Sequence, residues 1–227
     1  QRKEMQTLQF FYEMNFKNSL FFDRKISVTH KKTILYGPRK SGKSHLIIDH
    51  LSHYEKGSYL YIDFSDDRIE PHLVAENLPL FVQKNRIKLL IIEHFDFSFE
   101  LPKVDEILLT TIFTCKTLKG YDALTLYPLD FEEFISFDKK HSNIEHLFNL
   151  YTNNGTFPQI VQNGEQNSQK QMQEMLHLIL CDTATFLIYK RLCEMQSSKI
   201  SLFQIYNHLK AFTKISKDKL YAITADL

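Results

Sequence analysis

Hydrophobic positions along the chain alternate between short apolar runs and longer stretches with helical spacing. The short runs, bounded by glycine or polar residues, predict strands. They lie at 31–37, 57–67, 87–96, 105–113 and 122–129. The third run is the strongest, because residues 89–92 are continuously apolar, as in a strand covered on both faces. Helical spacing predicts helices in 5–16, 43–54 and 71–85, and Pro79 should interrupt or kink the last of these.

From Asp130 the character of the chain changes. Asp130 followed by Glu133 predicts a capping box, and the stretches 141–155 and 168–192 have helical spacing. Strands alternating with helices predict an α/β fold whose parallel sheet is covered on both sides and binds ligands at the carboxyl ends of its strands. The polar stretch around Gly164 suggests a linker, which divides the chain into domains 1–163 and 164–227.

Composition narrows the choice of partners and compartment. The 28 basic and 27 acidic residues nearly cancel, so any contact with nucleic acid or membrane must be a local patch. The three cysteines form no CxxC pair, which favours a reducing, cytoplasmic location over a disulfide framework or zinc ribbon. No run approaches about 18 uncharged apolar residues, so no membrane span is predicted. The chain lacks an initiator methionine and ends in mid-pattern, which suggests a fragment.

Residues 37–44, GPRKSGKS, match the phosphate-binding (Walker A) pattern G-x-x-x-x-G-K-[ST] at every fixed position. The glycines let backbone amides point at phosphates, and the following helix N-terminus adds its positive end. Lys43 should reach the β- and γ-phosphates and the Ser44 hydroxyl should ligate Mg²⁺. The predicted nucleotide-binding residues are Gly37, Pro38, Arg39, Lys40, Ser41, Gly42, Lys43, Ser44 and His45.

A second site is predicted at other strand ends. Glu93 ends the strongest strand and, with Ser44, is the expected Mg²⁺ ligand, although Asp96 lies only three residues on. Such a carboxylate is expected on a strand neighbouring the phosphate-loop strand. His94 follows as a proton acceptor or as an ordinary surface histidine. Thr110 ends a later strand, where it would meet a γ-phosphate or water, so Glu93, His94 and Thr110 are the catalytic candidates.

Several segments together resemble bacterial and archaeal P-loop ATPases of the AAA+ superfamily. Besides the phosphate loop, these are IKLLIIEHFD, the trailing YPLDFEEF and NGTFP, and the resemblance runs from about Lys31 to Val161. It implies ATP with Mg²⁺, a five-stranded parallel sheet with the phosphate-loop strand in the middle, and a helical lid. A winged-helix domain should follow, and 200–227 is similar to its helix-turn-helix part, with helices near 202–209 and 216–227.

Departures from the family pattern bear on hydrolysis. The family's Asp-Glu pair is Glu93-His94 here, and its Gly-Arg pair is Gly120-Tyr121. Its TGS-like sensor is Thr110-Thr111-Ile112. Groups that bind are retained and groups that stabilise the transition state are lost, which predicts slow hydrolysis or binding without turnover.

Two functions remain open. The chain is either an ATP/ADP-dependent switch or weak ATPase, or a nucleic-acid-binding or protein-interaction module in which the nucleotide is structural. The second rests on the helix-turn-helix pattern and on nearby lysines, which also suit a solvated helix face: Lys210, Lys214, Lys217 and Lys219. A homo-oligomer is left open, because AAA+ relatives often supply an arginine from a neighbouring subunit. A metal site at His45, His50 and His53 lacks a ligand-spaced carboxylate.

Overall fold

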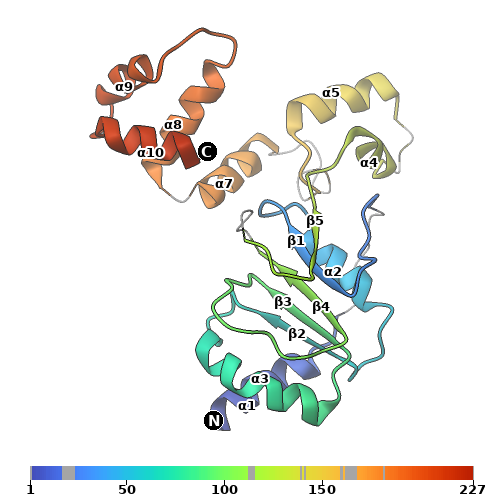
Figure 1. Cartoon of the computed structure of the whole chain (residues 1–227). Helices are drawn as coiled ribbons and strands as arrows, with labels where there is room; N and C mark the ends of the chain where they lie inside the picture. The colour runs from blue at the N-terminus through green and yellow to red at the C-terminus, as the bar shows by residue number, and fades with distance from the viewer. Residues whose placement is uncertain are drawn as a thin grey trace. The chain divides into compact units, whose positions relative to one another are not determined.

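The fold was analysed in a computed structural model, which describes residues 2–16, 24–111, 116–138, 140, 142–158, 161, 168–180 and 182–226. The chain divides into two compact units, residues 1–165 and 166–227. The first unit is an α/β domain with a five-stranded, all-parallel sheet, which confirms the predicted fold class (Figure 1). Its elements are α1 (Arg2–Glu13), β1 (Lys32–Tyr36), α2 (Lys43–Leu51), β2 (Tyr59–Asp63), α3 (Pro71–Asn85), β3 (Leu89–Glu93), β4 (Glu106–Thr110), β5 (Asp122–Thr125), α4 (Phe131–Ser136) and α5 (Ile144–Asn154).

The strand order is β2-β3-β4-β1-β5. It corrects two expectations. The phosphate-loop strand β1 is second from the edge rather than in the middle. The strand that ends in Glu93, β3, is not its neighbour, because β4 lies between them. Sequence order does not reveal this insertion, since β4 pairs with β1 across a long separation in the sequence.

Helices cover both faces of the sheet. The β1–α2–β2 crossover moves across the sheet in one direction and β2–α3–β3 returns in the other. Right-handed crossovers therefore place α2 and α3 on opposite faces. The first helix packs against α3 and β2, as Figure 1 shows. Its buried Leu8 and Phe11 lie on the face that the hydrophobic pattern predicted.

Two predicted helices differ in detail from the structure. Helix α3 runs without a break through Pro79. Burial of Val74, Leu78, Phe81 and Val82 outweighs the cost of about 3 kcal/mol for an interior proline. The predicted helix 168–192 is two helices, α7 (Ser168–Ile179) and α8 (Thr183–Glu194). Asp182 caps the second by accepting a hydrogen bond from the Thr185 backbone N–H.

The second unit is helical. After α7 and α8 come α9 (Leu202–Lys210) and α10 (Lys217–Asp226), close to the two predicted helices. Helices α8, α9 and α10 enclose a small core of Ile188, Ile205, Leu209, Ile215 and Leu220. A winged helix stays a prediction, since no strand occurs among the described residues of this unit. Gly164, the predicted linker position, lies outside the described residues. None of the described helices is long and apolar enough to span a membrane.

Candidate functional site

The phosphate-loop sequence forms a turn between β1 and α2, as predicted. Gly37 and Gly42 have φ values of 143° and 100°, in the region that favours glycine. A Cβ on Gly37 would lie 2.3 Å from the carbonyl oxygen of Leu126, just beyond β5. The first glycine is therefore required both by its backbone angle and by the close approach of the neighbouring strand.

The Lys43 side chain folds back over its own loop. Its Nζ donates hydrogen bonds to the carbonyl oxygens of Gly37 at 2.7 Å and Pro38 at 2.8 Å, and the residue is 8% exposed. Burial lowers the pKa of Lys43, Glu93 opposes that shift and Arg39 adds to it. The ammonium group is thus held at the loop by neutral carbonyls, which an anion can replace.

Ser44 and Glu93 meet across the carboxyl edge of the sheet. Ser44 Oγ donates to Glu93 Oε2 at 2.9 Å, and the Tyr61 hydroxyl donates to Oε1 at 3.1 Å. Glu93 is only 2% exposed, and burial raises the pKa of its carboxyl although both hydrogen bonds lower it. Among the described residues no lysine or arginine forms an ion pair with it.

This hydroxyl and carboxylate fit a Mg²⁺ ion. The carboxylate is buried and bonded to neutral donors, so a cation would relieve its desolvation. Mg²⁺ in nucleotide sites takes one or two protein oxygens and completes its shell with phosphates and water. Within the described ranges no group of three or more His, Cys, Asp and Glu forms a self-sufficient metal site. His45, His50 and His53 belong to no such group.

A second pair lies next to Glu93. The strand register places Asp63, the last residue of β2, beside Glu93. His94 Nδ1 lies 2.8 Å from Asp63 Oδ1, and Ser65 donates to the same carboxylate oxygen through its N–H and Oγ. Burial raises the pKa of Asp63, but the hydrogen bonds from His94 and Ser65 outweigh it and leave the pKa below its usual value. The ionised Asp63 accepts, so Nδ1 carries the imidazole proton.

Thr110 fixes the backbone at this point. Its Oγ1 accepts a hydrogen bond from the His94 N–H at 3.1 Å, and His94 has a φ of 57°, uncommon for a non-glycine residue. Thr110 and Thr111 are buried, and Ile112 of the predicted sensor lies outside the described residues. Thr110 thus positions His94 through the backbone, and its contact with a γ-phosphate or water stays a prediction.

The structure brings together most of the predicted site. Lys43, Ser44, Glu93, His94 and Thr110 gather at the carboxyl edge of β1, β3 and β4. The side chains of Arg39, Lys40 and His45 are exposed on the loop and the start of α2. Asp96, the alternative to Glu93, instead accepts a hydrogen bond from Ser98 N in the loop after β3.

Sequence reasoning missed Asp63 and Tyr61. Asp63 ends its strand as Glu93 does, so the rule that selected Glu93 would have selected it too. Tyr61 carries no such signal, because a tyrosine within a buried strand is ordinary core.

The chain is similar to two known archaeal proteins. No protein-family model matches the chain. An uncharacterized protein of Methanocaldococcus jannaschii is 25% identical over 238 residues, covering 86% of this chain and 54% of that protein. A crystal structure of a signal transduction ATPase with numerous domains from Pyrococcus horikoshii, with a tetratricopeptide repeat sensor, aligns at 14% identity with a TM-score of 0.40. That alignment covers 73% of this chain and 34% of the other. The chain thus spans about half and about a third of these two proteins.

Proposed function

We propose that this protein binds ATP with Mg²⁺ as an AAA+-like nucleotide-dependent switch or slow ATPase. The observation that carries the proposal is the contact between the phosphate loop and the acidic strand end. Ser44 Oγ, at the start of α2, lies 2.9 Å from the buried carboxylate of Glu93, at the end of β3. A hydroxyl and a carboxylate joined in this way beside a phosphate loop are the protein's share of a nucleotide-bound magnesium site.

Each part of the loop has a role in this proposal. The backbone amides at the start of α2 face the α- and β-phosphates. Lys43 exchanges the carbonyls of Gly37 and Pro38 for oxygens of the β- and γ-phosphates. Ser44 and Glu93 would hold the Mg²⁺ ion, which would supply positive charge to neutralise the phosphates.

Hydrolysis is expected to be slow. His94 follows Glu93, at the position where the family pattern has a second carboxylate. Asp63 accepts a hydrogen bond from Nδ1 of His94. The other ring nitrogen, Nε2, is the one that accepts a proton from water in this account. No arginine stands at the Gly120-Tyr121 pair to stabilise the charge that develops. Losing such a group costs several kcal/mol of barrier, roughly 10³-fold or more in rate.

Thermal protection tests the metal site. Mg²⁺-ATP at about 100 times its dissociation constant should stabilise the wild type by about 2.7 kcal/mol, with a smaller shift when Mg²⁺ is omitted. Ser44→Ala and Glu93→Gln should show the same small shift with and without Mg²⁺. Ser98→Ala, an exposed serine of the same unit, should behave as the wild type. A full Mg²⁺-dependent shift in both site variants would contradict the proposal.

Turnover of ATP by His94→Glu tests whether the missing second carboxylate makes hydrolysis slow. Restoring a carboxylate after Glu93 should raise the steady-state ATPase rate above that of the wild type. An unchanged rate with intact ATP binding would mean that the missing arginine limits hydrolysis, or that the protein only binds the nucleotide.

A second candidate function has support in the helical unit. Lys217 Nζ lies 4.7 Å from the ring centre of Phe203 and 5.6 Å from that of Tyr206, so cations and rings of α9 and α10 share one surface. Phe203 is 50% exposed. Cations beside exposed rings suit single-stranded nucleic acid, although the same surface suits a protein partner. DNA binding that weakens with salt and ignores ATP would favour this function, and absence of binding at low salt would remove its nucleic-acid form.

A further inference from the structure

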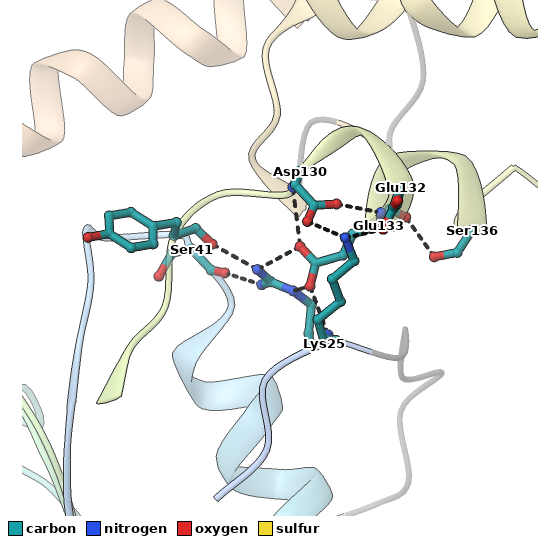
Figure 2. Close-up of polar contacts among 8 residues, drawn as sticks. Lys25, Ser41, Asp130, Glu132, Glu133 and Ser136 are labelled. Atoms are coloured by element: carbon teal, nitrogen blue, oxygen red, sulfur yellow. Dashed lines mark hydrogen bonds and ion pairs between the residues drawn. The ribbon is translucent and has the colours of Figure 1, made fainter. Parts of the chain in front are cut away.

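Arg24 joins three segments that are far apart in the sequence. Its Nη1 donates to the Ser41 carbonyl of the phosphate loop at 2.9 Å. Its Nη2 donates to the Tyr127 carbonyl at 2.8 Å. Its Nε and Nη2 form a two-pronged ion pair with Glu133, at 2.9 and 3.2 Å. Figure 2 shows the labelled Ser41 and Glu133, with the hydrogen bonds and ion pairs among the residues drawn as dashed lines.

This arrangement is built into the domain. The Arg24 and Glu133 side chains are only 10% and 6% exposed. Glu133 also accepts hydrogen bonds from the backbone N–H groups of Lys25 and Asp130. A buried guanidinium requires a paired carboxylate, so Glu133 fixes where the Arg24 fork points. The predicted capping box thus does more than start α4.

The contact with Ser41 orients the next peptide N–H. The peptide bond between Ser41 and Gly42 is trans, and in a trans peptide the carbonyl and the N–H point in opposite directions. Holding the Ser41 carbonyl toward Arg24 therefore turns the Gly42 N–H away from Arg24. The guanidinium also packs against Gly42, since Nη1 lies 3.4 Å from where a Cβ on that residue would be.

We propose that Arg24 is a positioning residue for the phosphate loop, and that Glu133 of the DFEEF segment acts through it. Together they preset the Gly42 amide for the phosphates of a nucleoside di- or triphosphate. The inference rests on the proposed nucleotide binding. It adds a coupling between the loop and α4, because any shift of α4 that moves Glu133 also releases the Ser41 carbonyl.

A purely structural ion pair is the competing explanation, and the chain provides a matched control. Lys25 pairs with Asp130 and Glu132 at the same end of α4, with side chains that are 49%, 51% and 80% exposed. Among the described residues, these three side chains form no hydrogen bond or ion pair with the phosphate loop. Lys25→Gln therefore removes a neighbouring cation while leaving the loop contact and the Lys25 backbone N–H in place.

The test makes two measurements on the wild type and each variant. Isothermal titration calorimetry gives the affinities for Mg²⁺-ATP and Mg²⁺-ADP, and unfolding without nucleotide gives the stability. Arg24→Gln should weaken both nucleotides about tenfold, as expected for one misplaced hydrogen bond to an anion. Arg24→Lys keeps a cation for Glu133 but not the fork that also reaches Ser41. It should unfold close to the wild type yet bind severalfold more weakly. Lys25→Gln should bind within about twofold of the wild type.

Different outcomes overturn different claims. Wild-type affinity in the folded Arg24→Lys and Arg24→Gln proteins, with binding lost in Lys43→Ala, would overturn the inference and leave nucleotide binding standing. If Arg24→Gln does not fold, Arg24→Lys alone decides, because a purely structural role predicts unchanged affinity in a protein that folds normally. Unchanged affinity in Lys43→Ala would instead overturn the proposed function itself.

Discussion

Replacing Gly37 by alanine should be the most damaging single-methyl change in the phosphate loop. Gly37 has a φ of 143°, and a Cβ there would lie 2.3 Å from the Leu126 carbonyl oxygen and 3.0 Å from Ser41 Oγ. The oxygen of Leu126 belongs to the backbone that leaves β5, where Leu126 N donates to the Tyr36 carbonyl at 2.9 Å. The Gly37 backbone and the Leu126 carbonyl cannot move apart without breaking the contact between β1 and β5.

The magnitude follows from two contributions. A backbone conformation that only glycine tolerates costs about 1–3 kcal/mol for another residue. Forcing an extra methyl group against fixed backbone adds about 1–3 kcal/mol. Gly37→Ala should therefore lower the free energy of unfolding by about 2–6 kcal/mol. Gly120→Ala is the matched control, because Gly120 has a φ of 82° and nothing within 4 Å of an added Cβ. It should cost only about 1–2 kcal/mol.

Urea-induced unfolding followed by far-ultraviolet circular dichroism measures both variants against the wild type. A drop in midpoint at unchanged slope reports lost stability of the folded state. In a thermal scan, the larger loss corresponds to a fall in Tm of roughly 2–4 °C per kcal/mol. Equal effects of Gly37→Ala and Gly120→Ala would refute the close approach between the loop and β5.

Further predictions concern the polar network around the site. Tyr61→Phe removes a donor to the buried Glu93 and should destabilise the protein by about 1–3 kcal/mol in urea unfolding. Tyr59→Phe, on the same strand, should cost under about 1 kcal/mol, and equal losses would contradict the Tyr61 contact. Burial raises the pKa of Glu133, but hydrogen bonds from Arg24, Lys25 and Asp130 outweigh it and set the pKa below the ordinary 4.5. The stability that Glu133 contributes is therefore complete above about pH 4.5 and lost as pH falls through the folded-state pKa. Glu133→Gln should flatten this part of the acid-unfolding curve, and an unchanged curve would contradict the pairing.

Local patterns predicted the parts of the fold that local interactions determine. The strand β3, the loop conformation around Gly37 and Gly42, and the capping box at Asp130 each follow from residues a few positions apart. The strand order could not be predicted in this way, because β4 is placed between β1 and β3 by long-range pairing. Pro79 does not interrupt α3, because tertiary burial of the helix outweighs the local cost of the proline.

In the candidate site, too, local sequence signals predicted some residues, while long-range contacts could not be predicted. The phosphate loop and Glu93 were found from motif and strand end, since both signals are local. The contact of Asp63 with His94 depends on the register between β2 and β3, which spacing alone does not determine. Arg24 reaches Glu133 across 109 positions of sequence. Such a contact is visible only once the strands have brought the two segments together.

Calorimetric titration of the wild type and Lys43→Ala with Mg²⁺-ATP tests nucleotide binding most directly. Lys103→Ala, an exposed lysine in the loop before β4, is the matched control for loss of one positive charge. The account predicts saturable heat for the wild type and Lys103→Ala, and at least tenfold weaker binding for Lys43→Ala. Equal affinities in all three proteins, or no heat with the wild type at millimolar nucleotide, would contradict it.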